Sequence, residues 1–180
     1  MKKIIYHVAT TVDGYIAHTD GKADTGFAHE GDHVTDYINS LQEDYSAVIM
    51  GRSTYEYGYQ FGLEKGRPAY ANMPNYVFSS SLDFPTFEGL KIVREDTVSF
   101  VRELKMDEGK PIYLCGGGRF AAHLFEHQLI DELLLKVNPV LFGNGIRLFE
   151  TVKEYEVALK LLDQKVYENG VMLQRYKIEY

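Results

Sequence analysis

Apolar positions recur with a helical period in several stretches of the chain. The clearest stretch has the spacing i, i+3, i+4, i+7, and its apolar residues are Val34, Tyr37, Ile38 and Leu41. This spacing predicts the buried face of a helix, and Asp32 could be its N-cap. Further helices are predicted just after Ser53, which could cap a short one, over 97–106, and over 119–127. In the last of these, the residues expected to face inward are Phe120, Ala121, Leu124 and Phe125.

Short apolar runs alternate with these helices and predict strands. The runs cover residues 3–9, 47–50, 76–78, 91–93, 111–115 and 133–137. From Tyr155 to Tyr176 the chain predicts a hairpin whose turn is Asn169-Gly170, a favoured pair for a tight two-residue turn. Alternating strands and helices indicate an α/β protein, and the late antiparallel pair makes its sheet mixed. Because no repeat or linker interrupts the pattern, we expect a single domain over residues 1–180.

The composition narrows the classes of partner. The chain has 180 residues, with 19 Lys and Arg against 26 Asp and Glu, and a formal net charge of −7. Nucleic acid binding needs clustered basic residues, whereas the longest basic run is Lys2-Lys3, so we expect no nucleic acid partner. No apolar run approaches the roughly 20 residues of a membrane helix, and the N-terminal run is too short for a signal peptide. Cys115 is the single cysteine, so we expect no internal disulfide and a cytoplasmic protein. The acidic charge still permits a small anionic molecule as partner, because a local site can be positive or lined by backbone N–H groups.

The strongest local motif is a strand that runs into Gly116-Gly117-Gly118 and then into a helix. Glycines let the backbone turn sharply and approach a ligand without a Cβ in between, and the helix start offers unpaired N–H groups. These features suit a pyrophosphate, although a tight connection without a ligand has the same pattern. A Rossmann fingerprint is disfavoured, because no acidic residue ends a strand about 20 residues later.

Two more strand ends carry polar residues that could bind phosphate. Gly51-Arg52-Ser53-Thr54 offers backbone N–H groups, an Arg fork and two hydroxyls. Ser79-Ser80-Ser81 offers hydroxyls that could accept a 2′-phosphate, whereas an acidic residue in that place would favour NAD. The alternatives are a capped helix with an exposed arginine and a serine-rich turn without a ligand.

In their order and spacing, these motifs resemble those of dihydrofolate reductases. The matching segments are 50–56, 78–80 and 115–120. The early segment 11–17 is more similar to the S-x-D-G-x-I-A segment of a sister family, the reductase domain of the bifunctional deaminase/reductase of riboflavin biosynthesis. The segment 139–145 is similar to that branch as well, so the resemblance covers nearly the whole chain.

The resemblance implies a dihydrofolate reductase-like fold, in which helices flank a mostly parallel twisted sheet with a C-terminal antiparallel hairpin at one edge. It also implies NADPH as cofactor and hydride transfer to a small heterocyclic or sugar-like substrate. The residues that it assigns to the cofactor are Ala9, Ile16, Gly51, Arg52, Ser53, Thr54, Ser79, Ser80, Gly116, Gly117, Gly118, Arg119 and Phe120. Asp13 is the expected substrate contact, with Asp36 or Asp32 as the second carboxylate, although an Asp-Gly turn would also explain Asp13.

Other assignments remain open at this point. A dihydrofolate reductase activity is one alternative, and a non-catalytic NADP-binding module is another, since Tyr is missing two residues after the glycine triplet. The riboflavin branch also implies a homodimer. The pairs His29/His33 and His123/His127 have i, i+4 spacing but lack H-E-x-x-H and a third ligand, so we expect no metal site. Cys115 is interpreted as a small packing residue.

Overall fold

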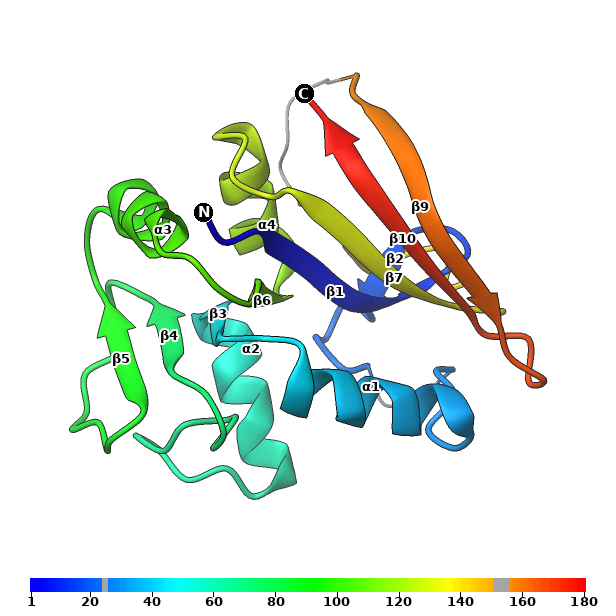
Figure 1. Ribbon diagram of the computed structural model, residues 1–180. Helices are drawn as coiled ribbons and strands as arrows, with labels where there is room; N and C mark the ends of the chain where they lie inside the picture. Colours follow the sequence, from blue (N-terminus) through cyan, green and yellow to red (C-terminus); the bar gives the residue numbers. More distant parts are fainter. Residues whose placement is uncertain (24–25, 151–155) are drawn as a thin grey trace.

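The computed structural model describes residues 1–23, 26–150 and 156–180. In these ranges the helices are α1 (Asp32–Glu43), α2 (Arg52–Tyr57), α3 (Thr97–Met106) and α4 (Gly118–Glu126), with a 3-10 turn over Gly58–Phe61. The strands are β1 (Ile4–Thr11), β2 (Tyr15–Ala17), β3 (Ala47–Gly51), β4 (Asn75–Phe78), β5 (Leu90–Val93), β6 (Ile112–Gly116), β7 (Glu132–Asn138), β8 (Ile146–Arg147), β9 (Ala158–Val166) and β10 (Met172–Glu179). Figure 1 shows this arrangement.

One large sheet has the strand order β5-β4-β3-β6-β1-β7-β10-β9. Along this order, the first six strands, β5, β4, β3, β6, β1 and β7, run parallel to one another. The next strand, β10, is antiparallel to both β7 and β9. A second, two-stranded sheet pairs β2 with β8. The predicted α/β class, the mostly parallel sheet and the antiparallel strands at one edge are thereby confirmed. Because parallel strands end at one edge, the segments that follow β1, β3, β4 and β6 emerge close together.

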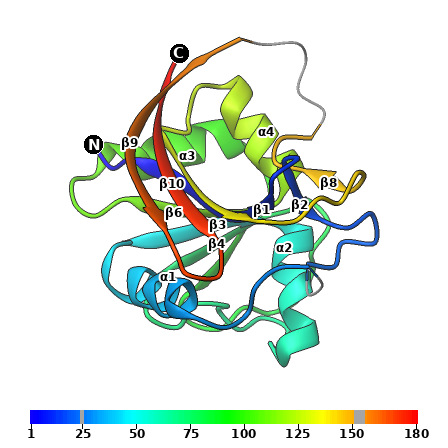
Figure 2. The same ribbon diagram turned by 90° about the vertical axis from the view of Figure 1, so that its right-hand side faces the viewer.

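Helices cover both faces of the parallel part of the sheet, with α3 and α4 on one face and α1 and α2 on the other (Figures 1 and 2). Successive strand residues point to opposite faces, so β1 contributes to two cores. Ile4 and Tyr6 belong to the cluster that includes Val101 of α3 and Leu124 of α4. Ile5 belongs to the cluster that includes Tyr55 of α2.

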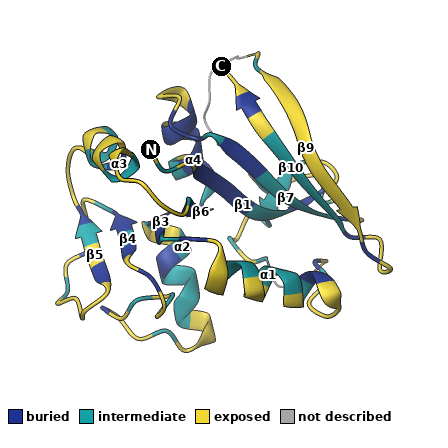
Figure 3. Cartoon of the chain, viewed as in Figure 1, coloured by how far each residue is buried: buried dark blue, intermediate teal, exposed yellow. Residues whose placement is uncertain are grey.

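Burial is deepest at the centre of the sheet and lowest at its antiparallel edge (Figure 3). Every residue of β9 is exposed. Among them are the large apolar residues Leu159, Leu161, Leu162 and Val166, whose exposures range from 45% to 67%. The outermost strand of the sheet therefore presents apolar surface to solvent.

Three local predictions about helices are wrong. Asp32 lies inside α1, whose N-cap is Gly31, and Ser53 lies inside α2, whose N-cap is Gly51. Ile38 is 48% exposed, whereas His33 of the same helix is 2% exposed. The histidine can be buried because its ring nitrogens lie 3.0 Å from the Ala28 carbonyl and 3.2 Å from the Asn169 amide.

The C-terminal hairpin forms around the predicted turn, but the connection is longer than two residues. β9 ends at Val166 and β10 begins at Met172, and Gly170 between them has φ of 81°. The predicted first residue of the hairpin, Tyr155, lies outside the described residues. The short strands β2 and β8 were not predicted, because two or three residues give no usable period. In the part of the chain that the structure describes, no helix combines the length and apolar character needed to cross a membrane.

Candidate functional site

The carboxyl ends of β3, β4 and β6 meet at one edge of the sheet. Gly51 at the end of β3 pairs in register with Phe78 at the end of β4, and Met50 pairs with Gly116 at the end of β6. A Cβ at Gly51 would lie 3.2 Å from the Cβ of Phe120, so the start of α4 lies directly against this strand end. All three motifs that were predicted to bind phosphate therefore lie in one corner of the molecule, which we call the phosphate corner.

Arg52 connects two of these motifs. Its Nη1 donates a hydrogen bond of 2.9 Å to the hydroxyl of Ser81, and its Nε lies 3.4 Å from the Glu56 carboxylate. The hydroxyl of Ser79 accepts the backbone N–H groups of Ser81 and Leu82, which fixes the turn after β4. Ser81, which the resemblance did not assign, is thus the serine that reaches Arg52, while the predicted Ser80 is exposed in the same turn.

Arg94 is another cation that sequence reasoning missed. It directly follows β5, the strand next to β4, so it emerges at the same edge of the sheet. Its Nη1 donates to the Leu82 carbonyl and its Nη2 lies 3.4 Å from the Asp83 carboxylate, which ties it to the turn that holds Ser79 and Ser81. A single arginine after a strand is too common to have been singled out from the sequence.

The glycine triplet packs closely against its surroundings. Gly116 has φ of 129°, and the Gly116–Gly117 peptide bond is cis. A Cβ at Gly117 would lie 3.2 Å from the hydroxyl of Thr54, which brings α2 and the triplet together. A Cβ at Gly118 would lie 2.3 Å from the backbone oxygen of Arg147, so internal packing by itself requires glycine at this position.

The first turn of α4 has an apolar and a polar side. The ring of Phe120 stacks on that of Phe78 with centroids 4.7 Å apart, which closes the corner between β4 and α4. Arg119 is mostly exposed and its Nε lies 3.7 Å from the Glu150 carboxylate. In the described part of the chain no side chain caps the start of α4 or of α2. The backbone N–H groups at the start of α4 are therefore available to a ligand.

Ala9 and Ile16 lie on neighbouring segments at the same edge. Ala9 is near the end of β1, where it pairs in register with Lys136 of β7. Ile16 is the central residue of β2, which pairs with β8, and Ile146 of β8 lies against Gly118. Figure 2 shows β2 and β8 beside α4 and the end of β1. The structure thus brings both residues to the neighbourhood of the glycine triplet.

Asp13 occupies the predicted Asp-Gly turn, and its carboxylate is held by three donors. It accepts the hydroxyl of Thr11 at 2.5 Å and the backbone N–H groups of Gly143 at 2.8 Å and Phe142 at 3.2 Å. The hydrogen bond from Thr11 and those from the two backbone groups lower the pKa of Asp13. This carboxylate is therefore an anion near neutral pH, suited to accept hydrogen bonds rather than to donate a proton.

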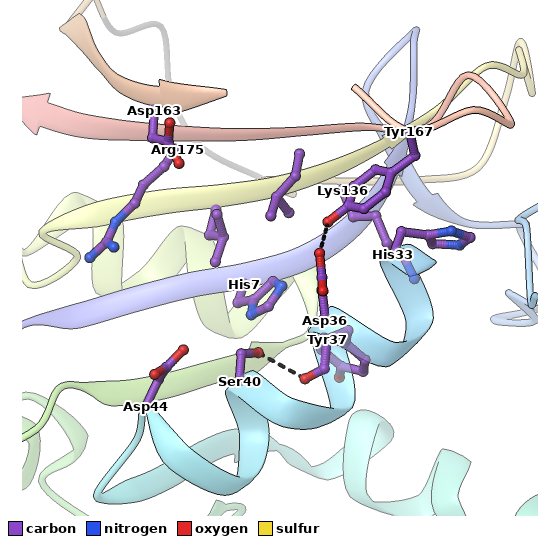
Figure 4. Close-up of a pocket in the computed structure, with 12 residues that line it drawn as sticks. His7, His33, Asp36, Tyr37, Ser40, Asp44, Lys136, Asp163, Tyr167 and Arg175 are labelled. Carbon is purple, nitrogen blue, oxygen red and sulfur yellow. Dashed lines mark hydrogen bonds between the residues drawn. The ribbon is translucent and has the colours of Figure 1, made fainter. Parts of the chain in front are cut away.

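Asp36 lies apart from the phosphate corner, in a cavity between α1 and the antiparallel part of the sheet (Figure 4). It accepts hydrogen bonds from the Lys165 ammonium at 2.6 Å and the Tyr167 hydroxyl at 2.7 Å. These two bonds, Lys165 first, lower the pKa of Asp36. Asp32, the alternative carboxylate, is exposed at the start of α1 and does not line this cavity.

His7 and Lys136 also line this cavity and were not predicted. Burial, with Lys136 and Arg175 nearby, lowers the pKa of His7 to about 3, so its ring is neutral at physiological pH. His7 lies 3.0 Å from the Tyr45 hydroxyl and packs edge-on against Tyr37 with ring centroids 5.0 Å apart. In the sequence, His7 and Lys136 each only interrupt the apolar pattern of a predicted strand, and nothing there indicates that the two side chains line one cavity.

The pair His123/His127 and the cysteine were weighed as a metal site and as a nucleophile. His123 and His127 lie side by side, but the described residues contain no group of three or more His, Cys, Asp or Glu side chains that could hold a metal ion. Cys115 is half-buried, 3.5 Å from the Tyr70 hydroxyl. Burial raises the pKa of its thiol, which disfavours the thiolate needed of a nucleophile.

The parallel sheet, the antiparallel edge and the glycine-rich corner define an α/β protein of the dihydrofolate reductase-like class. The sequence matches the RibD C-terminal domain family over residues 2–173, and the chain belongs to that family. The predicted resemblance to the riboflavin branch is thereby confirmed.

Individual relatives agree with this assignment. The protein YwjB of Bacillus subtilis (strain 168), named as uncharacterized, is 31% identical over 174 residues, which are 96% of each chain. A solved structure from Shewanella sp. PV-4, provisionally named a riboflavin biosynthesis protein, has a TM-score of 0.80 at 22% identity, with 100% of both chains covered. The diaminohydroxyphosphoribosylaminopyrimidine deaminase/5-amino-6-(5-phosphoribosylamino)uracil reductase of Thermotoga maritima has a TM-score of 0.72 at 17% identity, and the match covers 99% of this chain but 57% of that longer one. At these identities the two structures show the fold alone.

Proposed function

We propose that the protein is an NADPH-dependent reductase that transfers a hydride to a C=N or C=O group of a small heterocyclic or sugar-like substrate. The observation that carries the proposal is the meeting of three strand ends, with Arg52, Ser81 and the glycine triplet in one corner. Family membership supports it, since a shared fold with related reductases raises the expectation of shared chemistry without proving it. NADPH, when bound, supplies the hydride.

The residues present fit a phosphorylated dinucleotide. A guanidinium has five N–H donors, and Ser81 and Glu56 engage two of the nitrogens of Arg52, so donors remain for a phosphate. The uncapped start of α4 and the glycines before it offer backbone N–H groups to a pyrophosphate. The serine hydroxyls after β4, with Arg52 bonded to Ser81 and Arg94 after β5, favour a 2′-phosphate, and hence NADPH over NADH. Ala9 and Ile16 would flank the nicotinamide ring.

The two carboxylates line different cavities, so Asp13 and Asp36 are proposed as alternative substrate contacts, each as an anion. Asp13 lies at the end of β1 and Asp36 in the cavity beside α1, and both have lowered pKa values. They can therefore orient N–H or O–H groups of a substrate. A heterocyclic substrate such as 5-amino-6-(5-phosphoribosylamino)uracil is favoured by the name of the T. maritima relative. Dihydrofolate reduction is the second candidate, favoured by Asp36 on the first helix.

Consumption of NADPH in the presence of candidate substrates tests the enzymatic part of the proposal. The panel holds dihydrofolate, the uracil derivative above and its dephosphorylated form, and small lactones and imines. Oxidation of NADPH that depends on one of these substrates and is lost in the Gly117→Leu variant supports a reductase. If NADPH binds but no substrate increases its oxidation, the chain is better described as a non-catalytic NADP-binding module.

We further propose that the protein forms a homodimer through β9. An unpaired edge strand can pair with a second copy, and proteins usually protect such edges. Here β9 is exposed along its whole length and carries Leu159, Leu161 and Val166 on its surface. Light scattering at micromolar concentration tests this, since a clean monomer mass would rule the homodimer out.

A further inference from the structure

The cavity beside α1 has a volume of about 240 Å³ and combines aromatic walls with an apolar floor. Rings of His7, Tyr37 and Tyr167 line it, and Leu134 and Leu173 contribute aliphatic surface. In Figure 4, Asp36, Tyr37, Tyr167 and Lys136 lie at one end of the cavity, and Arg175, Asp163 and Asp44 lie at the other. Flat walls of this kind suit a planar ring.

Most polar groups deep in the cavity already have partners within the protein. Asp36 accepts from Lys165 and Tyr167. The Nε of Arg175 donates a hydrogen bond of 2.7 Å to the buried carboxylate of Glu132, and its Nη2 lies 2.6 Å from the same carboxylate. The Tyr37 hydroxyl lies 2.9 Å from that of Tyr113. These hydrogen bonds hold the groups in place, and Asp36 keeps its Oδ1 for a substrate donor because both of its bonds go to Oδ2.

Lys136 differs from them. Among the described residues, its ammonium has no hydrogen-bond or ion-pair partner, and it lies over the ring of Tyr37 with Nζ 5.4 Å from the ring centroid. The side chain is half-buried, and burial lowers the pKa of Lys136. A partly desolvated ammonium without a carboxylate is costly for the fold alone, which is the situation expected of a group that meets a ligand.

The position of Lys136 places it near the proposed reaction. It is the register partner of Ala9 across β1 and β7, and Ala9 is the residue expected to flank the nicotinamide. His7, two residues before Ala9 and on the same face of β1, is neutral and adds no competing charge. A ligand that contacts Lys136 would therefore extend along β1 toward the phosphate corner.

We propose that Lys136 binds the substrate, by donating a hydrogen bond from its ammonium to the carbonyl oxygen or imine nitrogen of a planar heterocycle held between α1 and β7. The inference rests on the proposed reductase function and narrows its substrate class to rings with an electron-rich acceptor at one edge. Lys136 then fixes which edge of the ring faces β1, and the walls of His7 and Tyr37 fix the plane of the ring.

Pyridoxal 5′-phosphate, a planar heterocycle with an aldehyde, is a direct probe of this arrangement. The neutral Lys136 amine would add to the aldehyde carbon and lose water to give an imine, and borohydride would then deliver hydride to the carbon while water protonates the nitrogen. Mass spectrometry of tryptic peptides locates the modified lysine. We expect Lys136 to be modified at probe concentrations that leave Lys65, an exposed lysine, unmodified. Modification of Lys65 with Lys136 left unmodified would overturn the inference.

Three variants make the result specific. Lys136→Met should lose the saturable imine absorbance while keeping its melting temperature and its NADPH binding. Lys165→Met, which removes the paired lysine beside Asp36, should keep the imine. Arg52→Gln should also keep it, because the probe is expected in the cavity rather than in the phosphate corner. An imine that survives in Lys136→Met would contradict the assignment.

The same samples separate this inference from the proposed function. If the wild type binds NADPH and leaves Lys136 unmodified, the inference fails alone. If Lys136 is modified but the wild type does not bind NADPH, the cavity still binds a carbonyl heterocycle, and it is the reductase role that is overturned.

Discussion

Replacement of Arg52 by glutamine should weaken NADPH binding while leaving NADH binding nearly unchanged. The guanidinium lies between Ser81 at 2.9 Å and Glu56 at 3.4 Å, so it is positioned before any ligand arrives. A hydrogen bond between charged partners contributes about 1.5 to 3 kcal/mol. Because half of the Arg52 side chain is exposed, solvent screening argues for the lower part of that range. At about 1.4 kcal/mol per tenfold change, the dissociation constant for NADPH should rise roughly 10- to 30-fold.

Isothermal titration of wild type and Arg52→Gln with each cofactor measures this difference. Arg102→Gln is the matched control, because Arg102 is exposed on α3, away from the phosphate corner. The comparison with NADH isolates the 2′-phosphate, since the two cofactors differ only in that group. Equal losses for NADPH and NADH in Arg52→Gln would show that Arg52 does not recognise the 2′-phosphate.

Further predictions concern stability, loop structure and assembly. Glu132→Gln should lower the free energy of unfolding by about 1.5 to 3 kcal/mol in urea titrations, because it weakens the hydrogen bonds that the partly exposed Lys3 and Arg175 donate to this buried carboxylate; an unchanged midpoint would contradict this. Burial opposes ionisation of Glu132, but the hydrogen bonds from Lys3 and Arg175 lower its pKa in the folded state. The stability that the ionised Glu132 contributes should therefore be present above the pKa of the unfolded chain and be lost as the pH falls through the folded pKa. Asp13→Asn should speed hydrogen exchange of the amides at 142–143 relative to the wild type at neutral pH, and equal rates would show that the carboxylate does not hold this loop. Leu161→Glu should convert the proposed dimer to a monomer in light scattering, and an unchanged mass would exclude β9 as the interface.

The fold could be predicted from the sequence because its signals are local and agree with one another. Apolar runs at 47–50 and 111–115 became β3 and β6, and the helix predicted over 97–106 became α3 with the same first and last residues. The Asn169-Gly170 turn located the hairpin. The strand order was not predicted, since no periodicity states which strands pair; the resemblance implied only the mostly parallel sheet with the hairpin at one edge.

The phosphate corner was predictable for the same reason, whereas the cavity was not. Each motif of the corner follows a strand directly, so parallel strands bring Gly51, Ser79 and Gly116 together. The cavity instead depends on side chains from α1, β1, β7 and β10, which meet only in three dimensions. His7 and Lys136 interrupt apolar strands and look like ordinary alternation until the burial of both side chains and the surroundings of the Lys136 ammonium are known.

The most direct test of the account is the melting temperature of the protein with saturating NADPH, compared with NADH. A ligand at 100 times its dissociation constant stabilises the folded state by about 2.7 kcal/mol, which for a chain of this size corresponds to a rise of roughly 5 to 10 °C. We predict such a rise with NADPH and a clearly smaller one with NADH at equal concentration. No rise with millimolar NADPH would contradict the claim that the three strand ends form a cofactor site.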